Sequence, residues 1–337
     1  MSEHIPARRR GRPSRELLYE RVREQIAELW DRLGGLPTPT EAQDIWRGLW
    51  YEEAHHSTAI EGNTLVLKQV EALLEQGRAV GNKELAEYLE VKGYADAADW
   101  VYRQASGPAM AADRQIVALA ELRHIHQMAL GPVWDVKPHP QASLKEQPGS
   151  FREHDIQPFP GGMTPPSWPL VQAEVDQWLD QVNRLETNGA RLIEDLATLH
   201  AGFERIHPFL DGNGRAGRLV LNLILVRLGY PPVIIYKRDR AKYLDALRRA
   251  DGGDPGALGE LLARSVLDNL HRFVVPAVAG PARIVPLAAL ANDEISAAAL
   301  RTAANRGRLQ ATRGQHGDWR SSRNWVDDYL SGRYRRG

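Results

Sequence analysis

Twelve consecutive residues hold a dense set of chemically active side chains. Residues 207–218 read HPFLDGNGRAGR, with one imidazole, one carboxylate, three glycines and two guanidiniums. Glycines let successive backbone N–H groups point into one concavity, and a helix N-terminus adds partial positive charge there. Two arginines three positions apart share one face of the following helix and can hold phosphate oxygens. The stretch therefore predicts a site for a phosphorylated ligand.

The ionisable members of this stretch suggest separate roles. A polyphosphate would repel Asp211 unless a divalent cation lay between them, so we expect this carboxylate to bind Mg²⁺ or Mn²⁺. His207 precedes the turn and can accept a proton from an attacking hydroxyl. His124 and His126 lie one residue apart without clustered acids, which favours packing or hydrogen bonding over metal binding. The chain holds no GxxxxGK[ST] sequence, so this is not a Walker loop.

A largely helical chain must position these residues. Apolar residues recur with helical spacing, which predicts helices at about residues 14–33, 45–60, 65–76, 83–105, 113–130, 168–184, 190–206, 215–228, 239–250 and 255–274. The helix after Gly214 is apolar all round, which is typical of a helix at the centre of a bundle. Residues 131–169 are rich in proline and glycine and predict a loop with a short hairpin.

Composition narrows the class of protein. The chain has 337 residues, 43% of them apolar, and its lack of cysteine excludes disulfides and thiolate zinc sites. No apolar run approaches the roughly 18 residues that a membrane span needs. The basic N-terminus lacks the apolar stretch of a signal peptide. We therefore expect a cytoplasmic protein without a membrane segment.

Charge is spread unevenly although the formal net charge is zero. Residues 1–15 carry a net charge of +4 and residues 283–337 a net charge of +5, whereas residues 16–282 carry −9. An acidic body with basic ends is typical of an enzyme or regulator whose appendages touch nucleic acid. Solvated basic tails are an equally simple interpretation.

A known protein family carries a closely similar motif. The sequence His207-Pro208-Phe209-x-Asp211-Gly212-Asn213-Gly214-Arg215-x-x-Arg218 resembles the HPFx(D/E)GNGRxxR motif of Fic proteins at every defined position, and the resemblance extends over about residues 40–272. It implies an all-α, Fic-type helical bundle with a small β-hairpin flap. It also implies a protein adenylyltransferase, which moves AMP from ATP to a hydroxyl of a target protein. The implied roles are general base for His207, metal ligand for Asp211, anion cradle for Gly212, Asn213 and Gly214, and outer-phosphate binding for Arg215 and Arg218.

The resemblance also covers the flap. Gly149-x-Phe151-Arg152 is similar to the start of the family's flap hairpin, whose extended edge can pair with a target backbone strand and present its hydroxyl to His207. The flap tip over the nucleotide would be formed by Gly161, Gly162 and Met163. The segment is two residues longer than the flap we expect, so individual contacts of the tip stay open.

Three further positions correspond to the adenine site of related proteins. Tyr243, Leu244 and Asp251 fall where those proteins often carry an aromatic pair and an asparagine. Leu244 and Asp251 depart from that pattern, which makes adenine selectivity less secure than phosphate binding. Tyr243 is equally well explained as a core aromatic residue.

An upstream segment resembles the family's inhibitory motif, [ST]xxxE[GN]. It reads Ser57-Thr58-Ala59-Ile60-Glu61-Gly62-Asn63. Ser57 and Glu61 are four residues apart and share a helix face, from which Glu61 can reach and occupy Arg218. An occupied arginine cannot hold a γ-phosphate, so the resemblance implies autoinhibition. A solvated helix-end charge is the alternative, and in some relatives the same glutamate supports removal of AMP.

Residues 284–332 resemble a small winged helix-turn-helix of the MerR/excisionase type. The resemblance rests on the pattern S-x3-L-R-x4-G-R-L-x-A…W…V-x-x-Y-L, in which Ser296 caps the second helix and residues 314–317 form the wing tip. It implies binding of duplex DNA through Arg301, Asn305, Arg306 and Arg308. A winged helix that docks on a protein is the alternative.

We therefore expect five segments along the chain. They are a basic flexible tail at 1–13, an N-terminal helical region with the inhibitory helix at 14–112, a Fic core at 113–275, a linker at 276–283 and a winged helix-turn-helix at 284–337. The expected function is an autoinhibited protein adenylyltransferase that uses ATP and Mg²⁺ and binds its target along the flap, and family members often form homodimers. The alternative is a DNA-binding transcriptional regulator whose Fic unit senses nucleotide.

Overall fold

The computed structural model describes residues 14–39, 42–105, 115–156, 162–187, 189–278, 280, 283–314 and 317–334. The expected basic tail at 1–13 and Gly161 of the flap tip lie outside this part of the chain. Most of the described residues are helical. The α-helices are α1 (Arg15–Leu33), α2 (Gln43–Ile60), α3 (Leu67–Gln76), α4 (Leu85–Tyr102), α6 (Leu119–Trp134), α7 (Val171–Asn183), α8 (Leu192–Ile206), α9 (Asn213–Arg227), α10 (Arg240–Asp251), α11 (Gly256–Asn269), α12 (Val275–Val278), α13 (Ala297–Asn305) and α14 (Arg323–Tyr334).

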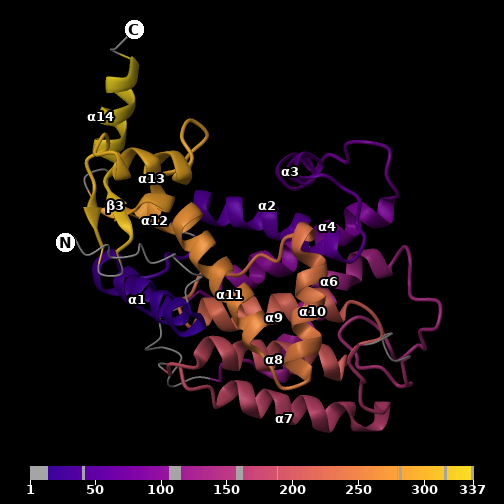
Figure 1. The fold of residues 1–337 in the computed structure, drawn as a ribbon. Helices are drawn as coiled ribbons and strands as arrows, with labels where there is room; N and C mark the ends of the chain where they lie inside the picture. Colours follow the sequence, from indigo (N-terminus) through magenta and orange to yellow (C-terminus); the bar gives the residue numbers. More distant parts are fainter. Residues whose placement is uncertain are drawn as a thin grey trace.

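Helix α9 lies at the centre of the bundle (Figure 1). It packs against α4, α6 and α8, and its side chains from Leu219 to Val226 are all buried. The prediction that the helix after Gly214 sits at the bundle centre is therefore confirmed. Because α9 is enclosed, its N-terminus is held rigidly where the motif begins. No helix in the described ranges is both long enough and apolar enough to cross a membrane.

Several expected boundaries are wrong. The helix expected at 113–130 is α6, which begins only at Leu119 and runs to Trp134, with Pro132 inside its last turn. A proline there removes only one backbone hydrogen bond, and the buried Trp134 side chain holds the turn against the core. The expected linker at 276–283 begins too early, because α12 continues to Val278 after the π-helical turn η3 (Leu270–Val274).

The flap differs from the expected hairpin. Its described residues, 150–156 and 162–167, contain no strand. Pro165 and Pro166 have no N–H group to donate to a ladder, which works against a paired edge. The base of the flap is instead tied to the motif by Arg152, whose backbone N–H donates to the carbonyl of Pro208 at 2.9 Å. Its buried guanidinium donates to the carbonyls of His154, Pro166, Ile206 and His207.

The C-terminal segment forms a small sheet with helices around it. The strands β1 (Val285–Pro286), β2 (Thr312–Arg313) and β3 (Trp319–Ser321) pair antiparallel in the order β1-β3-β2. Gly307 adopts a left-handed conformation just after α13, and strand β2 begins five residues later. A 3₁₀ turn, η4 (Leu287–Leu290), follows β1.

This C-terminal unit sits beside α1 (Figure 1). Arg320 on β3 donates to Glu28 on α1 at 2.7 Å, and the two side chains form an ion pair. Ser296 caps α13 as expected, since its hydroxyl accepts from the Ala299 N–H at 3.2 Å. The unit is thus packed on the N-terminal helix rather than held only by its connection to α12.

Candidate active site

The motif turn joins α8 to α9 and is shaped by two residues. Gly212 has a positive φ of 75°, and a Cβ atom there would lie 2.4 Å from the Leu130 side chain. Asn213 closes the turn, because its amide donates to the carbonyl of Phe209 and accepts from the same residue's N–H, both at 2.8 Å. The backbone N–H groups at the start of α9 are thereby fixed at the end of a buried helix, where an anion is favoured.

His207 ends α8 in a left-handed conformation, with φ 49°. It is the one residue other than glycine with positive φ in the described part of the chain, and such conformations often mark functional sites. Its Nδ1 lies 3.1 Å from the carbonyl oxygen of Glu204. A carbonyl only accepts, so Nδ1 carries the proton and Nε2 is the basic nitrogen of the neutral ring. Burial lowers the pKa of His207 to about 4, which keeps the ring neutral at pH 7.

Asp211 lies at the open side of the turn, with its side chain 48% exposed. Its Oδ1 accepts from the Gly212 N–H at 2.5 Å and from Nη2 of Arg215 at 3.2 Å. The described residues contain no cluster of three or more His, Cys, Asp or Glu that could hold a metal alone. Magnesium usually binds one or two carboxylates together with substrate phosphates, so a single exposed carboxylate beside an anion cradle fits that ion.

Arg218 is buried and bound by the segment expected to be inhibitory. Its Nε donates to the Ser57 hydroxyl at 2.7 Å, and its Nη2 donates to the Ser57 carbonyl at 3.0 Å and to Oε1 of Glu61 at 2.7 Å. Burial opposes ionisation of Glu61, but Arg218 outweighs it and lowers the pKa of that carboxyl below its usual value. The sequence expectation that Glu61 reaches Arg218 therefore corresponds to a contact in the structure.

Glu61 also fills space at the cradle. A Cβ atom added at Gly214 would lie 2.5 Å from Oε1 of Glu61 and 3.1 Å from Nη1 of Arg218. The Glu61 carboxylate therefore sits directly over a cradle glycine, on the first turn of α9. An incoming phosphate would meet a negative charge at that position, in addition to losing access to the arginine.

Glu204 is a buried acid that neither motif predicted. It lies on α8, and its Oε1 finds no hydrogen-bond partner among the described residues. A Cβ atom at Gly217 would lie 2.4 Å from that oxygen, so glycine is needed for the close approach. Burial raises the pKa of Glu204 to about 7, with Arg218 opposing the shift. Below that pH Glu204 is mainly neutral, and Glu61 is the ionised partner of Arg218.

Three other side chains support the turn without having been assigned to it. His126 stacks on Phe209 with ring centroids 3.6 Å apart, donates from Nε2 to the Asp211 carbonyl and accepts at Nδ1 from the Gly149 N–H. The expectation of a packing and hydrogen-bonding histidine is confirmed. Arg152 fixes the His207 carbonyl at 2.9 Å, and Glu90 binds Arg215 at 2.6 Å. Their sequence neighbours gave no signal for these roles, because each of the three side chains contacts a motif residue more than fifty positions away.

The residues expected near adenine differ in their exposure to solvent. Tyr243 is 1% exposed, and its hydroxyl lies 2.7 Å from Nε2 of His200, which favours the alternative of a core aromatic. Leu244 is exposed, and Asp251 forms a 3.5 Å ion pair with Arg205. Met163 is buried in the core. A role of these residues, or of Gly162, in binding a base stays a prediction.

The four side chains expected to touch DNA lie together on the surface of the C-terminal unit. Arg301, Asn305, Arg306 and Arg308 are all exposed, at and just after α13. Asn305 is partly engaged, because its Oδ1 accepts from Nε1 of Trp319 at 2.7 Å. The Arg313 guanidinium covers the same tryptophan at 3.9 Å.

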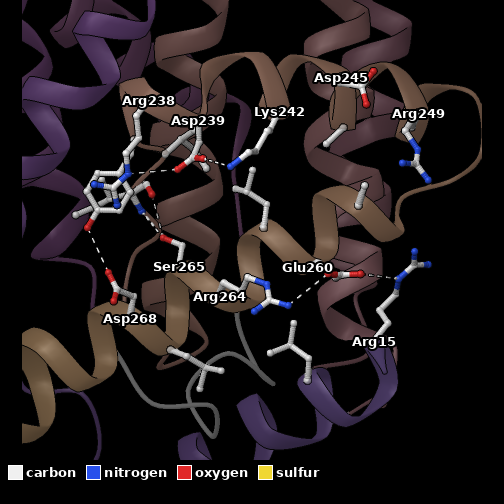
Figure 2. Close-up of a pocket in the computed structure, with 18 of the residues that line it drawn as sticks. Arg15, Arg238, Asp239, Lys242, Asp245, Arg249, Glu260, Arg264, Ser265 and Asp268 are labelled. Carbon is white, nitrogen blue, oxygen red and sulfur yellow. Dashed lines mark hydrogen bonds and ion pairs between the residues drawn. The ribbon is translucent and has the colours of Figure 1, made fainter. Parts of the chain in front are cut away.

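A large open cavity of about 920 Å³ lies elsewhere, between α1, α10 and α11. Several of its charged residues are paired: Lys242 pairs with Asp239, and Arg15 and Arg264 both pair with Glu260 (Figure 2). None of the motif residues lines it. We therefore place the candidate site at the motif turn rather than in this cavity.

Comparisons with known proteins cover the region that contains the motif turn. Residues 116–225 match the sequence profile of the Fic/DOC family. The chain is 29% identical over 273 residues to the protein adenylyltransferase fic-1 of Caenorhabditis elegans and 30% identical over 257 residues to the protein adenylyltransferase Fic of Drosophila mojavensis. These matches cover 81% and 75% of this chain but 51% and 47% of the relatives. The chain thus spans about half the length of the curated relatives it matches.

Solved structures show the same fold. Residues 134–508 of Fic-1 from C. elegans superpose with a TM-score of 0.60 and 27% identity, over 77% of this chain and 72% of that one. A Fic family protein from Desulfovibrio desulfuricans G20 superposes with a TM-score of 0.55 and 20% identity, over 93% of this chain and 97% of that one. The chain therefore carries a Fic/DOC domain within a predominantly helical fold that such proteins share.

Proposed function

We propose that this protein is an autoinhibited protein adenylyltransferase, which transfers AMP from ATP to a hydroxyl of a target protein. The observation that carries the proposal is the Glu61–Arg218 ion pair at 2.7 Å, located over the cradle at the start of α9. A site built to bind anionic phosphate has little reason to hold a carboxylate paired with a buried arginine at its mouth unless binding is regulated. The names of the relatives, protein adenylyltransferases, supply the reaction class.

The proposed reaction uses few groups. The oxygen of the target hydroxyl attacks the α-phosphorus of ATP and its proton passes to Nε2 of His207. The bond between that phosphorus and the bridging oxygen breaks, and pyrophosphate leaves. Arg215, Arg218 and the backbone N–H groups of residues 212–214 hold the phosphates and stabilise the charge that develops on them. Mg²⁺ held by Asp211 and the phosphates would neutralise part of that charge.

The flap residues would bind the target. An extended target segment would pass along the flap, with its hydroxyl facing His207. Arg152 supports this geometry, because the same buried guanidinium donates to the carbonyl of His207 in the motif and to that of Pro166 in the flap. The flap and the base are thus positioned by one side chain.

Removal of the carboxylate at residue 211 tests the metal assignment. We expect Asp211→Ala to weaken Mg²⁺-dependent ATP binding, because the cation loses its protein ligand. Titration of ATP into the Glu61→Gly variant with and without Asp211→Ala, at several Mg²⁺ concentrations, measures this. Asp211→Asn is the matched control, since it keeps the size and an acceptor oxygen. Equal Mg²⁺ dependence in all three proteins would remove Asp211 from the metal site.

A second function is suggested by the C-terminal unit, for which we propose duplex DNA binding. The exposed arginines at the end of α13, the three-stranded sheet and Arg313 beside the turn between β2 and β3 support a winged helix-turn-helix. A regulator whose Fic unit responds to nucleotide would combine the two activities. The alternative is that the same surface docks on a protein.

Salt dependence distinguishes these alternatives. We expect the full chain to bind duplex DNA with an affinity that falls linearly on a log–log plot against salt, because phosphate contacts release counterions. Arg301→Ala together with Arg308→Ala should reduce the slope by about 2, one unit for each lost contact. Arg184→Ala, at an exposed arginine just after α7, should leave the slope unchanged. Undetectable or salt-independent binding would favour the protein-docking alternative.

A further inference from the structure

Glu90 on α4 joins two segments that are distant in sequence. Its Oε1 accepts from Nη1 of Arg215 at 2.6 Å, and its Oε2 accepts from the side-chain amide of Asn63 at 2.9 Å. Asn63 and Arg215 are buried, and the Glu90 side chain is mostly enclosed. Buried ion pairs keep a fixed geometry, since losing one partner leaves an uncompensated charge. Glu90 therefore fixes the position of the first arginine of the motif.

The contacts of Arg215 show why this position matters. Its Nη2 reaches Oδ1 of Asp211 at 3.2 Å, so the guanidinium lies between a carboxylate on α4 and a carboxylate on the cradle turn. Its Nε is buried and finds no partner among the described residues. With Glu90 present, Arg215 is shared between the two acids. Without Glu90, Asp211 would be the remaining carboxylate partner, and the arginine would pair with it more closely.

Asn63 ties Glu90 to the segment that carries Glu61. The Asn63 amide donates to the Glu87 carbonyl as well as to Glu90, and its Oδ1 accepts from the Leu65 N–H at 3.0 Å. Asn63 and Leu65 lie two and four residues beyond Glu61, so these bonds hold the segment that directly follows it. The end of α2 thus reaches both arginines of the motif: Arg218 directly through Glu61, and Arg215 indirectly through Asn63 and Glu90.

We propose that Glu90 is a positioning residue for the phosphate site, which shares Arg215 with Asp211 and so keeps its guanidinium ready for the phosphates of ATP. The proposal rests on the proposed function, since it assumes that the motif binds ATP. The role proposed for Glu90 differs from that of Glu61, because loss of Glu61 frees the phosphate site whereas loss of Glu90 disorders it. A purely structural ion pair would stabilise the fold without changing ATP binding.

Calorimetric titration of ATP in the presence of Mg²⁺ tests this, with the Glu61→Gly variant as the parent. We expect Glu90→Ala to weaken ATP binding by about ten- to a hundred-fold, the usual range for a charge-assisted hydrogen bond. Glu90→Gln keeps the size and one acceptor oxygen, so its affinity should lie between those of the parent and the alanine variant. Asn63→Ala removes the bond that orients Glu90, together with the Asn63 bonds to Glu87 and Leu65, and should weaken binding by a few-fold.

Glu121→Ala is the matched control. Glu121 pairs with Arg227 at 2.6 Å at the other end of α9, in a similarly enclosed ion pair. This variant should lose thermal stability much as Glu90→Ala does and yet bind ATP like the parent. Thermal unfolding of each variant establishes that it is folded. If Glu90→Ala is not folded, the affinity of Glu90→Gln decides the test.

The outcomes separate the two proposals. Parental ATP affinity in folded Glu90 variants would overturn the positioning role and leave the proposed function intact. Equal weakening by Glu121→Ala would also overturn it, because stability alone would then explain the loss. If the parent itself bound no ATP, the proposed function would fail first, and Glu90 would have only a structural role.

Discussion

Glu61→Gly is expected to raise AMP transfer by about ten- to a hundred-fold. The change removes the carboxylate that binds Arg218 at 2.7 Å and that sits over Gly214. A charge-assisted hydrogen bond contributes about 1.5–3 kcal/mol, and each 1.4 kcal/mol corresponds to a factor of ten in the productive fraction. Initial rates of label transfer from ATP, at saturating ATP and Mg²⁺, measure the effect.

Three further variants test whether Arg218 mediates the inhibition. Arg218→Ala should not activate, because it frees the site but also removes a phosphate ligand. The double variant Glu61→Gly/Arg218→Ala should behave like Arg218→Ala alone, since the carboxylate has nothing left to act through. Ser57→Ala, which removes one hydrogen bond from Arg218 to an uncharged acceptor, should activate much less than Glu61→Gly. An unchanged rate in Glu61→Gly would make Glu61 a helix-end charge without a regulatory role.

His207→Ala is expected to lower transfer by about a hundred- to ten-thousand-fold, the usual contribution of a general base. ATP binding should be retained, because the cradle and both arginines belong to α9 and the preceding turn. Comparing the transfer rate with the ATP dissociation constant, both in the Glu61→Gly background, separates the two effects. Transfer at the parental rate would exclude His207 as the base.

The pH profile provides a second test of His207. A general base acts in its deprotonated form, so transfer is lost as the pH falls through the pKa of the base. Because burial lowers the pKa of His207 to about 4, the acid limb should lie near pH 4, well below the value near 6.5 for an exposed histidine. An acid limb near 6.5 that persists in a stable, folded protein would show that the ring is more solvated than the structure indicates.

Much of the fold could be predicted from the sequence because its helices are strongly patterned. The helical spacing of apolar residues predicted the approximate bounds of α1. The apolar residues on all sides of α9 predicted that this helix is buried. Pro132 misled the prediction of where α6 ends, because a helix tolerates a proline when a buried side chain such as Trp134 holds the following turn. The flap was predicted from resemblance, and its described residues adopt no strand.

The candidate site was predictable only where its residues are close in sequence. The motif at 207–218 was found from its unusual set of residue types. The contact between Glu61 and Arg218 was expected from a second motif. Glu90 carried no such signal, and the flap pattern did not show that Arg152 holds the motif, because both roles arise from contacts between elements far apart in the chain. Glu204 lies just outside the motif, and its approach to Gly217 depends on how α8 packs on α9. An arginine in a helix shows its charge in the sequence, but the acid that holds it is visible only after folding.

The central claim is tested most directly by following two differently labelled forms of ATP. The Glu61→Gly protein is incubated with Mg²⁺ and ATP labelled at either the α- or the γ-phosphate, and protein-bound label is measured for auto-modification and for an added cell extract. We predict that α-label becomes covalently attached to protein, that γ-label leaves in pyrophosphate, and that His207→Ala abolishes the attachment. Attachment of γ-label would indicate a phosphotransferase, and no attachment of either label together with undetectable ATP binding would contradict the proposed transferase altogether.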